Sequence, residues 1–273
     1  MLSTTYAPYL WIAIIYNAFW IGGLLNVLIY RIPVMIRRDT ENSAAAALGK
    51  PEPHASRYNL AWPASRCPAC GMRISFWQMI PVLSWIFMRG KCGHCHSHVS
   101  IRYPMIELAC GALISGAYIK YGLSDLWLGT GLALFSVSML CAAAIDAENA
   151  LLPDMITLGL LWSGIIFNAH GGWISSLECL YIAAGTYIFF SAISWLFELI
   201  WNCSVMRRGD IKLITAIAAW MGMRGVFVVA MASMAIYLMY RQALARRWDR
   251  ALPFGPFVCV PAVLLAWIGV QHV

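Results

Sequence analysis

Residues 126–145 of the chain read LWLGTGLALFSVSMLCAAAI, twenty residues without a charged side chain. An α-helix rises about 1.5 Å per residue, so a stretch of this length spans the roughly 30 Å of hydrocarbon in a lipid bilayer. Its apolar residues run continuously and do not alternate with polar ones, which favours a helix and argues against the strands of a membrane β-barrel. The stretch therefore predicts a transmembrane helix, which we place at residues 124–145.

Similar apolar segments recur along the 273-residue chain, of which 61% is hydrophobic and only 11% charged. Soluble domains carry about 25% charged residues. The expected fold class is an all-α polytopic membrane protein with about eight transmembrane helices. We place these at residues 8–30, 104–121, 124–145, 153–169, 175–200, 211–223, 225–240 and 254–272. Segment 211–223 is short for a full crossing and is expected to be tilted, kinked or partly re-entrant.

The long polar part of the chain, residues 31–103, lies between the first two apolar segments. We therefore expect a first transmembrane helix within residues 1–30, an extramembrane insert at 31–103 and a membrane domain at 104–273. The first segment lacks a basic leader and a small-residue cleavage site, so it predicts a retained helix and not a signal peptide. Within the insert, residues 38–53 have the composition of a loose, unstructured stretch.

The distribution of charge predicts which side of the membrane the insert occupies. Ten of the 19 Lys and Arg residues lie between Arg31 and Arg102, and seven more lie in or beside the short segments 201–212 and 241–253. Cytoplasmic loops carry such an excess of basic residues. The net charge of +7 is thus explained by membrane orientation, and no nucleic-acid partner is expected. With eight crossings both termini would lie outside.

Four cysteines of the insert form two C-x-x-C pairs with 21 residues between them. Four thiolates in this spacing can close a tetrahedron around Zn²⁺, and a small loop-rich domain needs such a staple to fold. A dithiol redox centre is the alternative, but one pair would suffice for it, and disulfides rarely persist in the cytoplasm. The expected zinc ligands are Cys67, Cys70, Cys92 and Cys95.

Two acidic residues lie at the predicted cytoplasmic ends of different membrane segments. Asp146 ends the segment 124–145, and Asp210 stands where the chain re-enters the membrane at 211. Two carboxyl groups brought together at the membrane boundary, where water is partly excluded, can share a proton and activate a water molecule between them. The alternative is that each is a helix cap or a boundary charge paired with a basic neighbour. Spacing alone does not decide between the two interpretations. Glu107, three residues inside the second segment, is expected to be paired or to lie at the interface, although acids within a membrane are functional candidates by default.

A series of short motifs resembles the type IV prepilin peptidase family, in the family's order and over nearly the whole chain. The matching segments are residues 22–27 (GGLLNV), 30–33 (YRIP), 65–71 (SRCPACG), 80–85 (IPVLSW), 89–92 (RGKC), 102–104 (RYP), 146–154 (DAENALLPD), 209–213 (GDIKL) and 251–257 (ALPFGPF).

The resemblance implies an aspartyl endopeptidase of the bacterial inner membrane. It would cut the leader from type IV prepilins or type II secretion pseudopilins at the cytoplasmic face, and then methylate the new N-terminus with S-adenosylmethionine. By position, Asp146 and Asp210 would be the catalytic pair and the four cysteines would hold the zinc associated with methyl transfer. No Gly-rich nucleotide fingerprint locates the methyl-donor site. Membrane lipid is the other expected partner, and the sequence carries no indication of oligomeric state.

The chain departs from the family pattern before Asp210. The family reads Met-Gly-x-Gly-Asp, whereas here Met206 is followed by Arg207, Arg208 and Gly209. Since glycine permits backbone conformations that arginine does not, the loop that presents Asp210 is expected to be stiffer or differently shaped. This leaves one alternative, a methyltransferase that has lost cleavage. A second alternative, a transporter or membrane scaffold with a zinc-ribbon interaction domain, would need polar residues at the bilayer midplane or a repeat between halves, and neither is evident.

Overall fold

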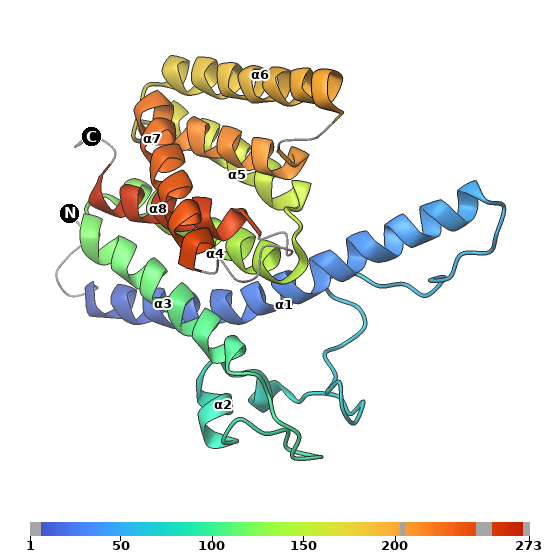
Figure 1. The fold of residues 1–273 in the computed structure, drawn as a ribbon. Coiled ribbons are helices and arrows are strands. Elements are labelled where there is room, and N and C mark those ends of the chain that lie inside the picture. The colour runs from blue at the N-terminus through green and yellow to red at the C-terminus, as the bar shows by residue number, and fades with distance from the viewer. Residues whose placement is uncertain (1–6, 203–205, 244–252, 270–273) are drawn as a thin grey trace. The chain divides into compact units, whose positions relative to one another are not determined.

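The computed structural model describes residues 7–202, 206–243 and 253–269, and it divides the chain into two compact units that meet between Ser124 and Asp125. Among the described residues the regular structure is entirely helical (Figure 1). Four helices are long and apolar enough to cross a membrane, namely those that begin near residues 8, 126, 176 and 208. The prediction of an all-α polytopic membrane protein is therefore confirmed.

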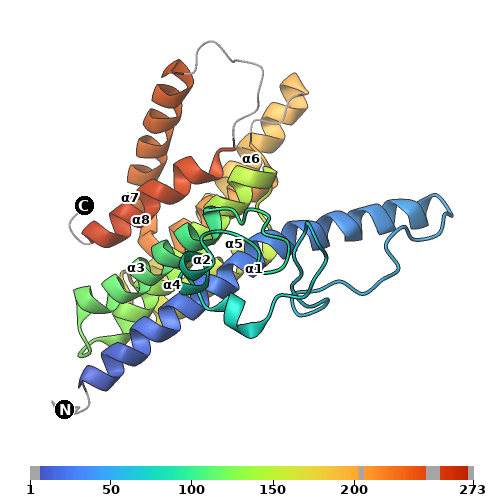
Figure 2. The ribbon, with the colours of Figure 1, turned by 90° about the horizontal axis from the view of Figure 1, so that it is seen from below.

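The first unit is built on two long helices, α1 (Ala7–Ala47) and α3 (Arg102–Tyr121), which pack side by side (Figure 2). The amide of Asn26 in α1 joins them, because its Nδ2 donates to the carbonyl of Tyr103 at 3.0 Å and to Glu107 Oε1 at 3.2 Å. Glu107 Oε2 in turn accepts from the backbone N–H of Val82 at 2.7 Å. The carboxylate of Glu107 thus ties the insert to both helices.

Helix α1 extends well beyond the expected end of the first segment at Tyr30. It continues through Pro33 to Ala47, so the prediction that residues 38–53 are loose was wrong for 38–47. A proline removes one helical hydrogen bond but does not forbid the turns that follow it, and the alanines at 44–47 favour a helix. Arg31 is buried in this helix, where its guanidinium donates to the carbonyls of Asn59 at 2.9 Å and Pro63 at 2.6 Å.

The rest of the insert is mostly irregular, with a 3-10 helix η1 (Phe76–Met79) and a short helix α2 (Leu83–Phe87). Two turns of the same design carry the cysteine pairs. In the first turn the N–H of Cys67 donates a hydrogen bond to the carbonyl of Met72. In the second the N–H of Cys92 donates to the carbonyl of Ser97. Each has its tight bend one residue after the second cysteine of its pair.

The second unit comprises α4 (Leu126–Asn149), α5 (Asp154–Ala169), α6 (Ser176–Trp201), α7 (Arg208–Ala243) and α8 (Gly255–Ile268). Helix α7 packs against α5, α6 and α8, while α4 packs against α8 and α5. The core is aromatic: Trp220 is fully buried, and its ring centroid lies 4.8 Å from that of Phe167 and 5.2 Å from that of Phe135. Its indole N–H donates to the carbonyl of Leu160 at 2.8 Å, so this large side chain leaves no polar atom unpaired.

The expected segments 211–223 and 225–240 form the two parts of α7. Gly222 interrupts this helix with φ 69° and ψ −171°. Figure 1 shows α7 as two stretches that run in different directions. The expected kink is thus present. Helices α5 and α8 are apolar but shorter than a full crossing. Of the last expected segment, 254–272, the described part is helical as far as Ile268. Residues 244–252, with three arginines of the expected cytoplasmic loop, lie outside the described residues.

Candidate active site

Asp146 occupies the last turn of α4 and is completely buried. Its Oδ2 accepts a hydrogen bond of 2.7 Å from the backbone N–H of Gly255, the first residue of α8. The position requires glycine, because a Cβ at residue 255 would lie 2.7 Å from the same Oδ2. The start of α8 therefore fixes the carboxylate from one side. Sequence reasoning did not identify Gly255 as part of the site, although it lies in the matching segment 251–257.

Asp210 lies in the first turn of α7 and is only 6% exposed. Its place at the beginning of a helix favours a negative charge, because the unpaired N–H groups of the first turn carry partial positive charge. Asp154, the first residue of α5, instead forms an exposed ion pair with Lys212 at 2.6 Å. Asp154 is therefore a paired boundary charge, as the alternative reading of such residues expects, and it takes no part in the site.

The structure brings Asp146 and Asp210 together on a single guanidinium, that of Arg207. Arg207 Nη1 lies 3.2 Å from Asp146 Oδ1, and Arg207 Nε lies 3.2 Å from Asp210 Oδ2. Arg207 Nη2 lies 3.4 Å from one oxygen of each carboxylate. Nη1 also donates to the carbonyl of Ala150 at 2.7 Å, which holds the side chain over the end of α4.

The charge of this arrangement follows from its composition. Burial acts to lower the pKa of Arg207, but the charges of Asp210 and Asp146 outweigh it and raise that pKa above its ordinary value. The guanidinium is therefore permanently positive, and the group of three side chains carries two carboxylates against one cation. The sequence showed that Arg207 replaces a glycine of the family pattern, but it did not predict that Arg207 contacts both acids. The available signal was a basic residue three positions before Asp210, close enough to reach its carboxylate.

The four cysteines of the first unit also converge. Their Sγ atoms all lie within 4.8 Å of one another, and Cys67 Sγ is 3.9 Å from Cys95 Sγ. In a tetrahedral zinc site with Zn–S bonds of about 2.3 Å, the sulfurs lie about 3.8 Å apart, so these residues fit the ion. Backbone N–H groups of Cys70 and Ala69 lower the pKa of the Cys67 thiol to about 6. A thiol of low pKa favours the thiolate form that a metal needs.

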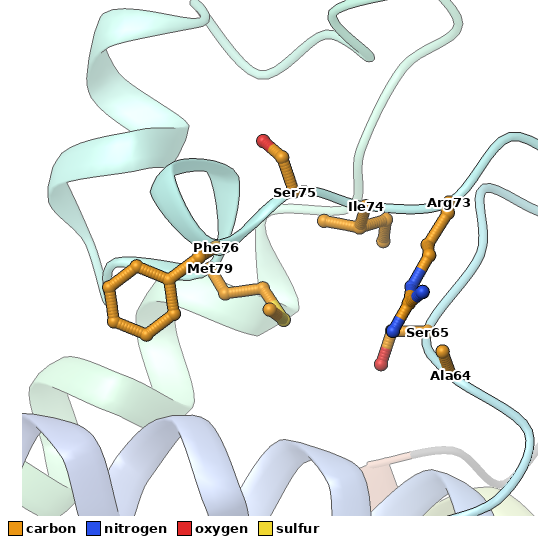
Figure 3. A pocket seen from close by; sticks show the side chains of 7 residues that line it. All are labelled: Ala64, Ser65, Arg73, Ile74, Ser75, Phe76 and Met79. Atoms are coloured by element: carbon orange, nitrogen blue, oxygen red, sulfur yellow. The ribbon is translucent and has the colours of Figure 1, made fainter.

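A cavity of about 480 Å³ lies beside the first cysteine turn (Figure 3). Phe76 and Met79 line one end, while Arg73, Ser65 and Ala64 line the other. This volume is in the range of small-molecule sites. No acidic side chain lines the cavity.

The comparisons with known proteins agree with this geometry. The model of the bacterial peptidase A24 N-terminal domain matches residues 17–121, and that of the type IV leader peptidase family matches residues 132–241. A prepilin leader peptidase/N-methyltransferase of Burkholderia pseudomallei (strain 1026b) is 37% identical over 258 residues, which cover 91% of this chain and 82% of the relative. The chain belongs to the type IV leader peptidase family.

Other relatives of the family extend the comparison to further bacteria. The proteins of the same name from Stutzerimonas stutzeri and Pseudomonas aeruginosa are 35% and 34% identical to this chain. Each alignment covers 90% of this chain and 87% of the relative. No solved structure matches the chain. The resemblance found in the sequence motifs is thereby confirmed, and a transporter or scaffold has no support from these relatives.

Proposed function

We propose that this membrane protein is an aspartyl endopeptidase. It removes the leader of type IV prepilins or type II secretion pseudopilins, and then methylates the new N-terminus with S-adenosylmethionine. The proposal is supported by the family and by the relatives, which are named prepilin leader peptidase/N-methyltransferase. The observation that carries the catalytic assignment is that Asp146 and Asp210, from two helices, share one guanidinium.

The proposed reaction needs one ionised and one protonated carboxyl group. The ionised group takes a proton from a water molecule as the water oxygen attacks the scissile carbonyl, and the protonated group gives its proton to the carbonyl oxygen. When the intermediate collapses, the C–N bond breaks, the leaving nitrogen takes the proton that the first group removed from water, and the second group recovers its proton from the hydroxyl of the intermediate. Burial of Asp146 and Asp210 excludes bulk water and strengthens each of these interactions.

The proposed orientation follows from the basic residues of the insert and of segment 201–212. The insert and the acidic pair would face the cytoplasm of the inner membrane, where the leader of a newly made substrate lies. The insert would hold Zn²⁺ on Cys67, Cys70, Cys92 and Cys95, where the ion joins the two cysteine turns and stabilises the fold around them. The expected domains would then be a first membrane helix at residues 1–30, the zinc-binding insert at 31–103 and the peptidase domain at 104–273.

The test is cleavage of a purified prepilin in detergent or lipid vesicles, followed by gel mobility and mass spectrometry. Asp146→Asn and Asp210→Asn are each expected to abolish leader release, by at least about 10³-fold, because each removes one of the two proton-transfer groups. Asp154→Asn is the matched control, since it is the same substitution at an exposed ion pair outside the site.

Normal processing by both site variants would disprove the catalytic assignment. Methyl incorporation into a substrate that is supplied without its leader separates the two activities. A protein that methylates this substrate but never releases a leader would support the alternative of a methyltransferase without cleavage.

A further inference from the structure

The guanidinium of Arg207 takes the place that the reaction requires for water. A water molecule activated by both acids would form a hydrogen bond of about 3 Å with one oxygen of each carboxyl group. Arg207 Nη2 occupies such a position between the two acids, since it lies 3.4 Å from Asp146 Oδ2 and 3.4 Å from Asp210 Oδ1. With the side chain in this position the two acids contact a cation where they would otherwise share a nucleophile.

The same contact also works against the protonation state that cleavage requires. Arginine stays protonated at all accessible pH values, and an opposite charge within about 4–6 Å lowers the pKa of a carboxylate by about 1–3 units. The positive charge of Arg207 therefore favours the ionised form of the acids while it contacts them, whereas burial of Asp210 favours the protonated form. The contact thus opposes formation of the protonated carboxyl group that must give a proton to the scissile carbonyl oxygen.

We propose that Arg207 is a latch: it holds the acidic pair in an inactive resting state, and binding of the substrate peptide displaces its guanidinium before cleavage. The inference rests on the proposed function and concerns its regulation. The side chain can leave, because it is 42% exposed and, among the described residues, only the Ala150 carbonyl binds its guanidinium besides the two acids. The family pattern has glycine at this position, which carries no side chain and provides no such latch.

The other titratable groups around the pair leave Arg207 as its one direct cation among the described residues. On α8, the thiol of Cys259 interacts electrostatically with both acids and with the thiol of Cys141 on α4. On α7, Lys212 is occupied by Asp154 of α5. A change in the protonation of the acids on removal of Arg207 is therefore attributable to that residue.

The test compares Arg207→Met with Arg208→Met in the full-length protein. Both remove one positive charge from adjacent positions, but only Arg207 contacts the acids, whereas Arg208 is exposed at the start of α7. Arg207→Gly, which restores the family residue, is the second variant in case methionine disturbs folding. The rate of leader release is measured against substrate concentration and pH for each protein.

A latch acts on the free enzyme, whose ionisations govern kcat/KM, and not on the enzyme–substrate complex, which governs kcat. Arg207→Met removes a positive charge that favours the ionised acids, so the alkaline limb of kcat/KM is expected to move up by at least about one pH unit. At a pH above that limb kcat/KM rises about tenfold or more, because one pKa unit changes the protonated fraction tenfold. The value of kcat stays within about twofold, and Arg208→Met leaves both quantities unchanged.

Two results overturn the latch. A large fall in kcat with Arg207→Met and Arg207→Gly would mean that the guanidinium stabilises the transition state. An unchanged kcat/KM profile in both would mean that it does not restrain the acids at all.

A second measurement decides the matter even if no variant cleaves, an outcome that would disprove the proposed function separately. In protein labelled with ¹³C at the aspartate carboxyl carbons, the signals lost in Asp146→Asn and in Asp210→Asn identify the pair. The Asp210 signal is expected to titrate at lower pH in the wild type than in Arg207→Met, by about 1–3 units, because the charge of Arg207 favours its ionised form. Equal titration in the two proteins would overturn the latch.

Discussion

At the scale of single residues, Gly255 offers a sensitive test of the proposed site. A Cβ at this position would lie 2.7 Å from Asp146 Oδ2 and 2.9 Å from Asp146 Cβ, so Gly255→Ala must push the carboxylate away. A displacement of about 1 Å at a reacting group costs about 100-fold in rate, and we expect a loss of that order in leader release. The variant should remain folded, as judged by its thermal unfolding in detergent.

The control for this prediction is Gly159→Ala, since a Cβ at Gly159 in α5 meets nothing within 4 Å. It replaces glycine by a better helix former and should not reduce cleavage. Full activity of Gly255→Ala would show that the position of Asp146 does not matter for the reaction, contrary to the proposed mechanism.

The sequence allowed the meeting of Asp146 and Asp210 to be expected, because both stand at helix ends on the same predicted side of the membrane. Their partners could not be derived in this way. The contacts of Arg207 with Asp146 and Ala150, and of Gly255 with Asp146, join residues more than 50 positions apart. Such contacts depend on how α4, α7 and α8 cross, and a pattern along one segment holds no information on those crossings.

At the scale of helices, the shape of α7 depends on Gly222. Its φ of 69° and ψ of −171° lie in a region that is open almost only to glycine, and strain there costs about 1–3 kcal/mol. Gly222→Ala is therefore expected to lower the free energy of unfolding by about that amount, measured as a lower unfolding midpoint in detergent. Gly185→Ala, in the open face of α6, should leave the midpoint nearly unchanged. A midpoint as high in Gly222→Ala as in the wild type would show that the helix can straighten at no cost.

The apolar segments predicted the existence of the helices more reliably than their ends. Each expected membrane segment is helical in its described part, because long apolar runs have few alternatives in a bilayer. The extension of α1 to Ala47 was missed because residues 38–47 are polar or small and Pro33 precedes them. Hydropathy does not report a helix that continues out of the membrane. Contacts with the insert hold this helix in place, such as the two hydrogen bonds between the Asn42 side chain and the backbone of His54.

At the scale of the whole molecule, the two proposed chemistries fall in different compact units. The cysteine cluster lies before Ser124, and the acidic pair with all of its described partners lies after Asp125. The sequence predicted this separation in outline, since the cysteines lie in the polar insert and both aspartates in the apolar part. How the units sit against each other is beyond any reading of composition or motif.

Because the units are separate, removal of the metal should affect the two activities unequally. We expect Cys92→Ser, or treatment with a zinc chelator, to loosen the insert, since four thiolates without an ion no longer join its two turns. The acids keep Gly255 and Ala150 as neighbours, so most leader release should persist while methyl incorporation falls by about tenfold or more.

The substrate's first residue is analysed by mass spectrometry, the bound zinc is quantified, and limited proteolysis follows the segment 48–101. His94→Asn, an exposed change between Cys92 and Cys95 that removes no thiolate, is the control and should retain both zinc and methylation. If Cys92→Ser stops leader release as completely as methylation, the insert also shapes the proteolytic site. The division of labour between the units would then be wrong.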